Sequence, residues 1–262
     1  MYTSKTAGRG FISLGICLRD KNPTNTNRFK TLFQAELEAL GEEGDSDANF
    51  MLGLRAYHGA DSSPAPRVAA VYWRHAAEKG HTDAMYSLSL LYLNGRGVQA
   101  SPKKAIELLY HACSRHHPGA LNRLGCHFWW GDVVSQDREK ALTLFTYAHQ
   151  LGSAEAAYNL GIYCLSPTPS YNDVRSGIHY LCQAAQQYLP EAMAQLAACF
   201  DGKYPLFEDR AASRQWRELA ARFDHLPSQL HLASHYLYID KSQKAYQWLH
   251  RAAQQGHAPR NT

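Results

Sequence analysis

Apolar and small residues recur along this chain with a period of 36 residues. One column holds alanine at five successive steps and serine at the sixth: Ala48, Ala84, Ala120, Ala156, Ala192 and Ser228. Four residues further on, a second column holds only leucine, namely Leu52, Leu88, Leu124, Leu160, Leu196 and Leu232. The residue after each leucine is small, namely Gly53, Ser89, Gly125, Gly161, Ala197 and Ala233. A fixed period of this length indicates a repeat architecture in which each unit packs against the next.

The spacing within one unit predicts two helices joined by a turn. Ala84, Leu88 and Tyr92 are four residues apart, which places them on one face of a first helix. After the sequence NGRGV, Ser101 suits the N-cap of a second helix and Pro102 its first position. A further column marks the buried face of the second helices, namely Ala76, Ala112, Ala148, Ala184, Ala220 and, only 32 residues on, Ala252. A single hairpin cannot bury its apolar face, so the units must stack.

Several of these segments resemble a known repeat family. DAMYSLSLLYLNGRGV (83–98), EAAYNLGIYC (155–164) and the helix ends HAAEKG (75–80) and RAAQQG (251–256) are similar to the Sel-one-like repeat (SLR) family, relatives of tetratricopeptide repeats. The resemblance covers residues 47–258. It implies an all-α fold, a right-handed α/α superhelix (solenoid), that serves protein–protein contact without catalytic residues or a cofactor.

The repeats predict where the chain divides. We expect about six units, with approximate bounds 47–80, 81–116, 117–152, 153–188, 189–224 and 225–258, within a region that runs from 47 to 262. Upstream, FKTLFQAELEALGEEG (29–44) resembles another second helix, with Gly44 standing 36 residues before Gly80. SLGICL (13–18) is interpreted as a degenerate first helix. We therefore expect residues 1–46 to form an N-terminal segment with a degenerate capping repeat.

The composition of the chain disfavours two classes of partner, nucleic acid and the membrane interior. The formal charge is +4, from 27 basic and 23 acidic residues, and no run of five like charges marks a nucleic-acid tail. No stretch approaches the roughly 20 apolar residues that span a bilayer, so we expect neither nucleic acid nor membrane insertion. The apolar segment FISLGICL (11–18) is followed by charged residues and makes a poor signal peptide. We expect a cytoplasmic protein, or a periplasmic or secreted one if a signal has been removed.

Three motifs contain residue types that occur in functional sites, but their spacing or context does not support such a site. GRGVQASPKK (95–104) has neither the GxxxxGK[ST] nor the GxGxxG spacing of a phosphate loop, so its glycines are interpreted as a helix–helix turn. HLASH (231–235) lacks the glutamate of a zinc peptidase, because Leu232 occupies that place. His111, His116 and His117 cluster at a helix end, where a capping or surface role is expected.

The cysteines give no structural zinc site either. None of the six forms a CxxC pair, and we interpret them as reduced thiols packed like small apolar residues. A disulfide between Cys164 and Cys182 stays open if the chain lives in an oxidising compartment. No catalytic, cofactor-binding or metal residue is predicted.

The candidate site is the surface lined by the first helices. If the stack curves as tetratricopeptide arrays do, positions near the leucine column face inward. Aromatic residues and arginine dominate interface hot spots, and amides hold an extended peptide backbone. The residues predicted to bind a partner protein or peptide in this concave groove are Tyr86, Asn94, Arg123, Trp129, Trp130, Tyr158, Asn159, Gln195 and His231.

The alternative for the aromatic residues is that several of them fill gaps between repeats. Trp129 and Trp130 are adjacent, and neighbours on a helix diverge by about 100°. The two rings therefore cannot both be buried to the same extent, and we expect one of them to be accessible.

Three classes of function follow from this sequence. The leading hypothesis is a non-catalytic scaffold or adaptor that binds another protein. The alternatives are a secreted or periplasmic envelope or virulence factor, and an immunity protein that neutralises a toxin. An enzyme with its site between repeats is the least favoured interpretation.

Overall fold

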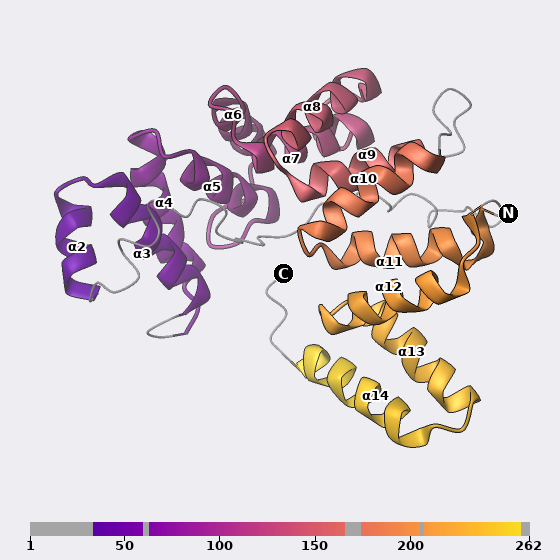
Figure 1. The fold of residues 1–262 in the computed structure, drawn as a ribbon. Helices are drawn as coiled ribbons and strands as arrows, with labels where there is room; N and C mark the ends of the chain where they lie inside the picture. Colours follow the sequence, from indigo (N-terminus) through magenta and orange to yellow (C-terminus); the bar gives the residue numbers. More distant parts are fainter. Residues whose placement is uncertain (1–33, 60–62, 166–173, 205–206, 258–262) are drawn as a thin grey trace, which may run out of the picture. The chain divides into compact units, whose positions relative to one another are not determined.

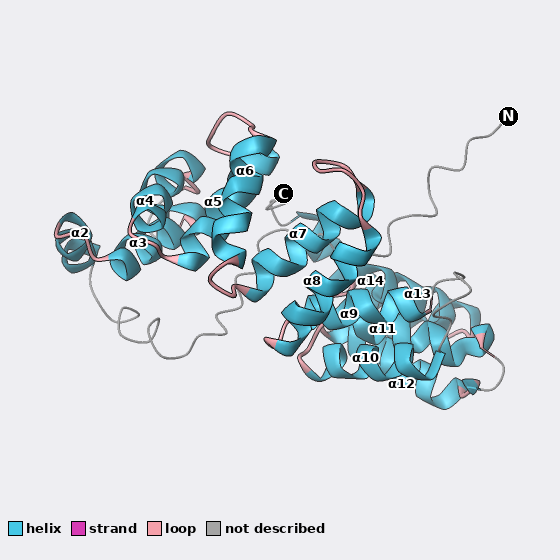
Figure 2. Ribbon diagram, turned by 90° about the horizontal axis from the view of Figure 1, so that it is seen from above, coloured by secondary structure: helices cyan, strands magenta, loops and turns pink. Residues whose placement is uncertain are grey.

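The computed structural model describes residues 34–59, 63–165, 174–204 and 207–257, and within them every regular element is a helix (Figures 1 and 2). The predicted all-α fold is therefore confirmed. The elements are α2 (Gln34–Glu42), α3 (Ser46–His58), α4 (Pro66–Glu78), α5 (Thr82–Asn94), α6 (Pro102–Cys113), α7 (Pro118–Trp130), α8 (Arg138–Gln150), α9 (Ala154–Cys164), α10 (Val174–Gln186), α11 (Pro190–Ala198), the short π-helix η1 (Cys199–Lys203), α12 (Arg210–Arg222), α13 (Leu226–Tyr238) and α14 (Ser242–His257).

Within the described ranges, consecutive helices from α3 onward pair into six hairpins. α3 packs on α4, α5 on α6, α7 on α8, α9 on α10, α11 on α12 and α13 on α14. The chain divides into two compact units, which we call the α2–α8 unit and the α9–α14 unit, with the boundary between Leu151 and Gly152. Inside each unit the second helix of one hairpin also packs on the first helix of the next, as α4 does on α5 and α12 on α13.

The predicted N-terminal capping repeat lies only partly within the described residues. Its second helix is present as α2, which packs on α3 through the fully buried Leu37. The proposed first helix at 13–18 lies outside the described residues.

The periodic columns form the core, as the sequence predicts. All five alanines of the first column and all six leucines of the second are buried, and Ser228 is buried in the sixth unit. The alanine column of the second helices is buried too, including Ala252 after its shortened spacing. Each hairpin thus contributes the same two inner faces to the core.

The small residues beside the leucines let the two helices of a hairpin approach closely. A Cβ placed on Gly53 would lie 2.3 Å from the indole ring of Trp73, and one on Gly125 would lie 2.7 Å from the ring of Phe145. A Cβ on Gly161 would lie 2.9 Å from Leu181. Larger residues would overpack these contacts.

The GRGV segment is a turn between helices, as predicted. Gly95 ends α5 in the left-handed conformation, with φ 64° and ψ 24°. Ser101 caps α6 by accepting a hydrogen bond from the backbone N–H of Lys104, and Pro102 follows at the first helical position. Gly97 also has a positive φ of 74°, and a Cβ there would lie 2.4 Å from the carbonyl carbon of Pro66. The turn therefore lies directly against the start of α4.

Candidate partner-binding surface

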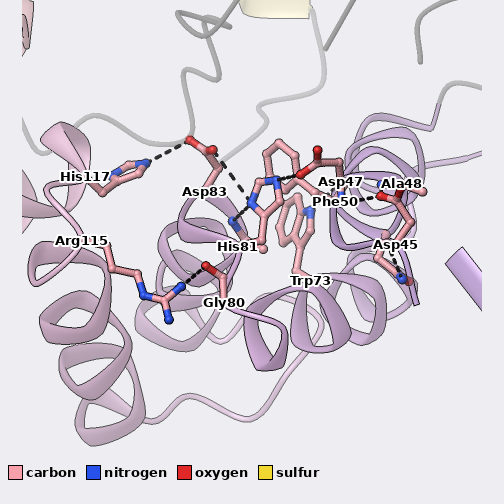
Figure 3. Close-up of polar contacts among 12 residues, drawn as sticks. Asp45, Asp47, Ala48, Phe50, Trp73, Gly80, His81, Asp83, Arg115 and His117 are labelled. Atoms are coloured by element: carbon pink, nitrogen blue, oxygen red, sulfur yellow. Dashed lines mark hydrogen bonds and ion pairs between the residues drawn. The ribbon is translucent and has the colours of Figure 1, made fainter. Parts of the chain in front are cut away.

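The first helices of the α2–α8 unit begin at residues 36 positions apart, Asp45, His81 and His117, and each caps its own helix (Figure 3). The carboxylate of Asp45 accepts hydrogen bonds from the backbone N–H groups of Asp47 and Ala48, both at 2.9 Å. Nδ1 of each histidine accepts a hydrogen bond from the backbone N–H three residues on, at 3.2 Å for His81 and 2.9 Å for His117. Such caps satisfy backbone donors that the first turn of a helix leaves without partners.

The same histidines join successive repeats. Because Nδ1 accepts, the proton of the neutral ring lies on Nε2, which points to an aspartate of the preceding unit. Nε2 of His81 lies 3.3 Å from Oδ1 of Asp47, and Nε2 of His117 lies 3.1 Å from Oδ1 of Asp83 (Figure 3). We call Asp47, His81, Asp83 and His117 the histidine–aspartate staple.

Aromatic rings of the preceding unit cover both histidines. The ring of Phe50 stacks on His81 with centroids 4.5 Å apart, and Tyr86 lies 4.8 Å from His117. Arg115 adds a further link across the repeat boundary by donating a hydrogen bond to the carbonyl oxygen of Gly80 (Figure 3). The predicted groove residue Tyr86 is therefore half-buried in a contact between repeats.

Burial and the neighbouring carboxylates act on the two ionisable groups at the centre of the staple. Burial lowers the pKa of His81 below its ordinary value, although Asp83 and Asp47 act in the opposite direction. Burial alone raises the pKa of Asp83, but the hydrogen bond from His117 and the nearby imidazole rings leave it below its ordinary value. The folded state therefore favours a neutral His81 beside a charged Asp83.

The prediction for the histidines near residue 117 was right about capping and wrong about the group that is capped. His117 accepts from the backbone N–H of Ala120 in the following helix, whereas histidines at the end of a helix commonly cap the carbonyls of that helix. His116, by contrast, forms a hydrogen bond between its Nδ1 and the hydroxyl of Tyr147, which lie 2.6 Å apart. Sequence analysis missed the staple itself, although Asp45, His81 and His117 form a visible column with the same period.

Groove candidates in the α2–α8 unit divide into covered and accessible residues. Trp129 is 6% exposed and Arg123 is 7% exposed, so neither offers much surface to a partner. Trp130 is 41% exposed, which confirms the expectation that only one of the two rings is accessible. Asn94, which precedes the αL glycine of its turn as Trp130 does, is also exposed.

Groove candidates in the α9–α14 unit divide in the same way. Tyr158 and Asn159 are buried. Burial raises the pKa of Tyr158 to about 12, and the negative charge of Glu191 contributes to this shift to a smaller extent. Gln195 is half-buried and His231 is exposed, with its Nε2 beside the guanidinium of Arg217. Among these four residues, only His231 is exposed.

The described residues show no grouping suited to bind a metal. Among them, no three side chains of histidine, cysteine, aspartate or glutamate are placed so that together they could hold a metal ion. His231 lies beside Arg217, whose fixed positive charge disfavours a cation there.

None of the described cysteines, Cys164 and Cys182 included, forms a disulfide. Burial raises the pKa of Cys113 to about 12 and that of Cys199 to about 11, so neither forms a thiolate readily. Among the described helices, none is long and apolar enough to cross a bilayer.

A family model decides the identity of the repeats. The model of the Sel1 repeat matches residues 46–81, 82–117, 118–153, 154–189, 190–222 and 227–257. The chain belongs to the Sel1 repeat family. No curated protein matches this chain by sequence.

Solved Sel1 repeat proteins share the fold. A Sel1 repeat protein from Oxalobacter formigenes is 20% identical with a TM-score of 0.72, over 84% of this chain and 98% of its own. A protective antigen with an SLR fold from uropathogenic Escherichia coli is 25% identical with a TM-score of 0.66 over 86% of this chain. This chain spans about half of that antigen, 49% of its length. An immunity protein from Pseudomonas aeruginosa is 16% identical with a TM-score of 0.61, over 96% of this chain and 90% of its own.

Proposed function

We propose that this Sel1 repeat chain is a non-catalytic scaffold that binds a segment of a partner protein on the exposed ends of its first helices. Sel1 repeat proteins are generally protein-interaction scaffolds. The observation that supports this surface is the exposure of Trp130 at the end of α7, where the adjacent Trp129 is buried.

Trp130 belongs to a row of accessible side chains. His58, Asn94 and Trp130 are 36 residues apart, all three are exposed, and each precedes a glycine in the left-handed conformation. We call these three residues the exposed row. It combines a large ring with polar groups that donate and accept hydrogen bonds, which suits an extended segment of a partner.

The partner is identified by affinity purification and mass spectrometry, and its binding to purified protein is then measured by calorimetry. Trp130→Ala should weaken binding at least tenfold, because exposed tryptophans are frequent hot spots. Tyr147→Ala is the matched control, since Tyr147 is an aromatic residue of similar exposure on a second helix.

Both variants should keep the helical circular-dichroism signal of the wild type. Equal binding by Trp130→Ala and the wild type would remove the exposed row from the site. Equal loss in both variants would instead indicate that the partner uses the second helices as well.

A narrower function, as a toxin-neutralising immunity protein, is supported by two structural neighbours that are named immunity proteins from Pseudomonas aeruginosa. Co-expression with the product of a neighbouring toxin gene tests it: restored growth supports this function, and undiminished toxicity contradicts it. The other alternative is a secreted or periplasmic envelope or virulence factor. We propose instead that the protein is located in the cytoplasm. Fractionation of cells carrying the tagged native gene distinguishes the two compartments.

A further inference from the structure

Two stretches of the α2–α8 unit carry basic residues and no carboxylate. Residues 63–77 contain Arg67 and Arg74, and residues 84–106 contain Arg96, Lys103 and Lys104, with no aspartate or glutamate in either stretch. This concentration contrasts with the whole chain, in which basic residues exceed acidic ones only by 27 to 23.

The fold brings the two stretches together. The turn at Gly97 lies against the first turn of α4, since a Cβ on Gly97 would be 2.6 Å from the backbone nitrogen of Arg67. Arg74 and Lys104 line one open pocket of about 490 Å³, together with Tyr92, Val98, Gln99 and Ser101. We call this pocket and its flanking cations Arg67 and Lys103 the basic pocket.

The cations of the basic pocket form no ion pair in the described part of the chain, although Glu78 stands four residues after Arg74 and Glu107 three residues after Lys104. Arg67, Arg74, Lys103 and Lys104 are exposed, and no described carboxylate forms an ion pair with any of them. The ammonium of Lys104 lies over the ring of Tyr92, 5.5 Å from its centroid. Arg96 is different, because it donates a hydrogen bond to the hydroxyl of Tyr57 and stacks on that ring, which fixes the turn.

At the equivalent turn of the next repeat, acidic residues offset the basic ones. Lys140 lies over the ring of Phe128 as Lys104 lies over Tyr92, with 4.2 Å to the centroid. Three carboxylates accompany it there, Asp132, Asp137 and Glu139, within the described residues 131–140. The basic pocket is therefore a property of one turn and not of the repeat in general.

We infer that the basic pocket binds an acidic segment of a partner protein, with a carboxylate side chain seated beside Arg74 and Lys104. Arginine forms bidentate hydrogen bonds with carboxylates, and the pocket is large enough for several side chains. A nucleic acid fits less well, because Lys104 covers the ring of Tyr92 that would otherwise stack on a base. This site shares no residue with the exposed row, although Asn94 adjoins it in sequence, and it goes beyond the scaffold function proposed above.

Fluorescence anisotropy tests the basic pocket with a labelled decapeptide of alternating glutamate and alanine. The full-length protein should bind this peptide, and binding should weaken as salt rises from 50 to 300 mM, because charge pairs at an exposed site are screened. The same peptide with glutamine in place of glutamate should not bind. The double variant Arg74→Glu with Lys104→Glu should weaken binding of the glutamate peptide at least tenfold.

A matched control separates the pocket from net charge. The double variant Arg210→Glu with Arg214→Glu makes the same charge change on the exposed face of α12 and should bind the peptide as the wild type does. Circular dichroism should show that both double variants fold. Equal loss in the two variants, no binding by the wild type, or tighter binding of a labelled ten-nucleotide single-stranded RNA would each overturn the assignment.

Discussion

The first helices of both units start with an N-cap residue every 36 positions, but the type of capping residue differs between the units. In the α2–α8 unit the caps are Asp45, His81 and His117, whereas in the α9–α14 unit the corresponding residues are Ser153, Leu189 and His225. Ser153 accepts a hydrogen bond from the backbone N–H of Ala156 through its hydroxyl, and Leu189 makes no side-chain cap. The fold thus requires a helix start every 36 residues but tolerates several residues at it.

The difference between the caps lies in how they connect the repeats. The two histidine caps of the α2–α8 unit also contact an aspartate and an aromatic ring of the preceding repeat. A serine hydroxyl is too short for that and cannot change its charge between pH 5 and 8, whereas histidine does. We therefore expect the α2–α8 unit to respond to pH through His81, and its caps to contribute more to stability.

The largest effect on stability is expected at the close contact between the two helices of a hairpin, which occurs in both units. Gly53→Ala should destabilise α3 and α4 by about 3 kcal/mol, because the added methyl group would displace the rigid indole of Trp73. That indole is fully buried and donates its N–H to the carbonyl oxygen of Phe50 at 3.2 Å. Gly161→Ala should cost less, about 1 to 2 kcal/mol, because its nearest neighbours, Leu181 at 2.9 Å and the carbonyl oxygen of Gly177 at 3.1 Å, leave more room than the indole at 2.3 Å from Gly53.

Amide hydrogen exchange followed by mass spectrometry reports each hairpin separately and checks this pair. Exchange should accelerate in α3 and α4 for Gly53→Ala, and to a smaller extent in α9 and α10 for Gly161→Ala. A larger effect at Gly161 would contradict the view that the aromatic ring makes the contact less adaptable.

The sequence predicted the columns of the core because each is held by one packing rule that acts in every repeat. Ala84 and Leu88 are buried for the same reason as Ala156 and Leu160, so one unit predicts the next. The turn after α5 was predictable too, since Ser101, Pro102 and Gly95 each have a conformational preference that acts locally.

The candidate site was harder to predict, because it depends on how far each side chain is covered. Periodicity places Arg123 and Asn159 one residue before the leucine column but says nothing about the depth of burial there. The structure covers both side chains, and their assignment to a partner stays a prediction. The staple was missed because a histidine before a helix is a weak signal until its aspartate, 34 residues earlier, is seen beside it.

Removing one cap from each unit is the next test of the comparison. His81→Ala should cost about 2 kcal/mol, because it removes the cap of α5, the contact with Asp47 and the stacking on Phe50. Ser153→Ala should cost about 1 kcal/mol, the usual value for an N-cap alone. Urea unfolding followed by circular dichroism measures both, and equal losses would show that the staple adds nothing to the cap.

Lowering the pH sharpens the comparison without removing a cap. The pKa of His81 is lower in the folded protein than its unfolded value of about 6.5. The unfolded chain therefore binds the proton first, so stability is present above about pH 6.5 and is lost as the pH falls toward the folded pKa. Asp83, Asp47, Asp45 and His117 face this ring, and Asp83 stays charged over the interval because its pKa is also lowered.

The variant His81→Asn isolates this effect. Asparagine is a good N-cap and does not titrate, so the variant should keep the helix start and lose part of the drop in urea midpoint between pH 7 and pH 5. The same drop in the variant and the wild type would show that other groups, such as His225, cause the pH dependence.

The smallest expected effects concern the residues that end the second helices. Gly44, Gly80 and Gly152 have a positive φ, and so do His116, Tyr188 and Asp224 at the same step of the period. A left-handed conformation costs a non-glycine residue about 1 kcal/mol, so His116→Gly should stabilise the α2–α8 unit by up to about 1 kcal/mol, less the lost hydrogen bond with Tyr147. Tyr188→Gly should gain less, because the ring of Tyr188 lies 5.4 Å from that of Phe223. Thermal unfolding of both variants checks the order, and a lower midpoint for His116→Gly would show that the contact with Tyr147 outweighs the backbone preference.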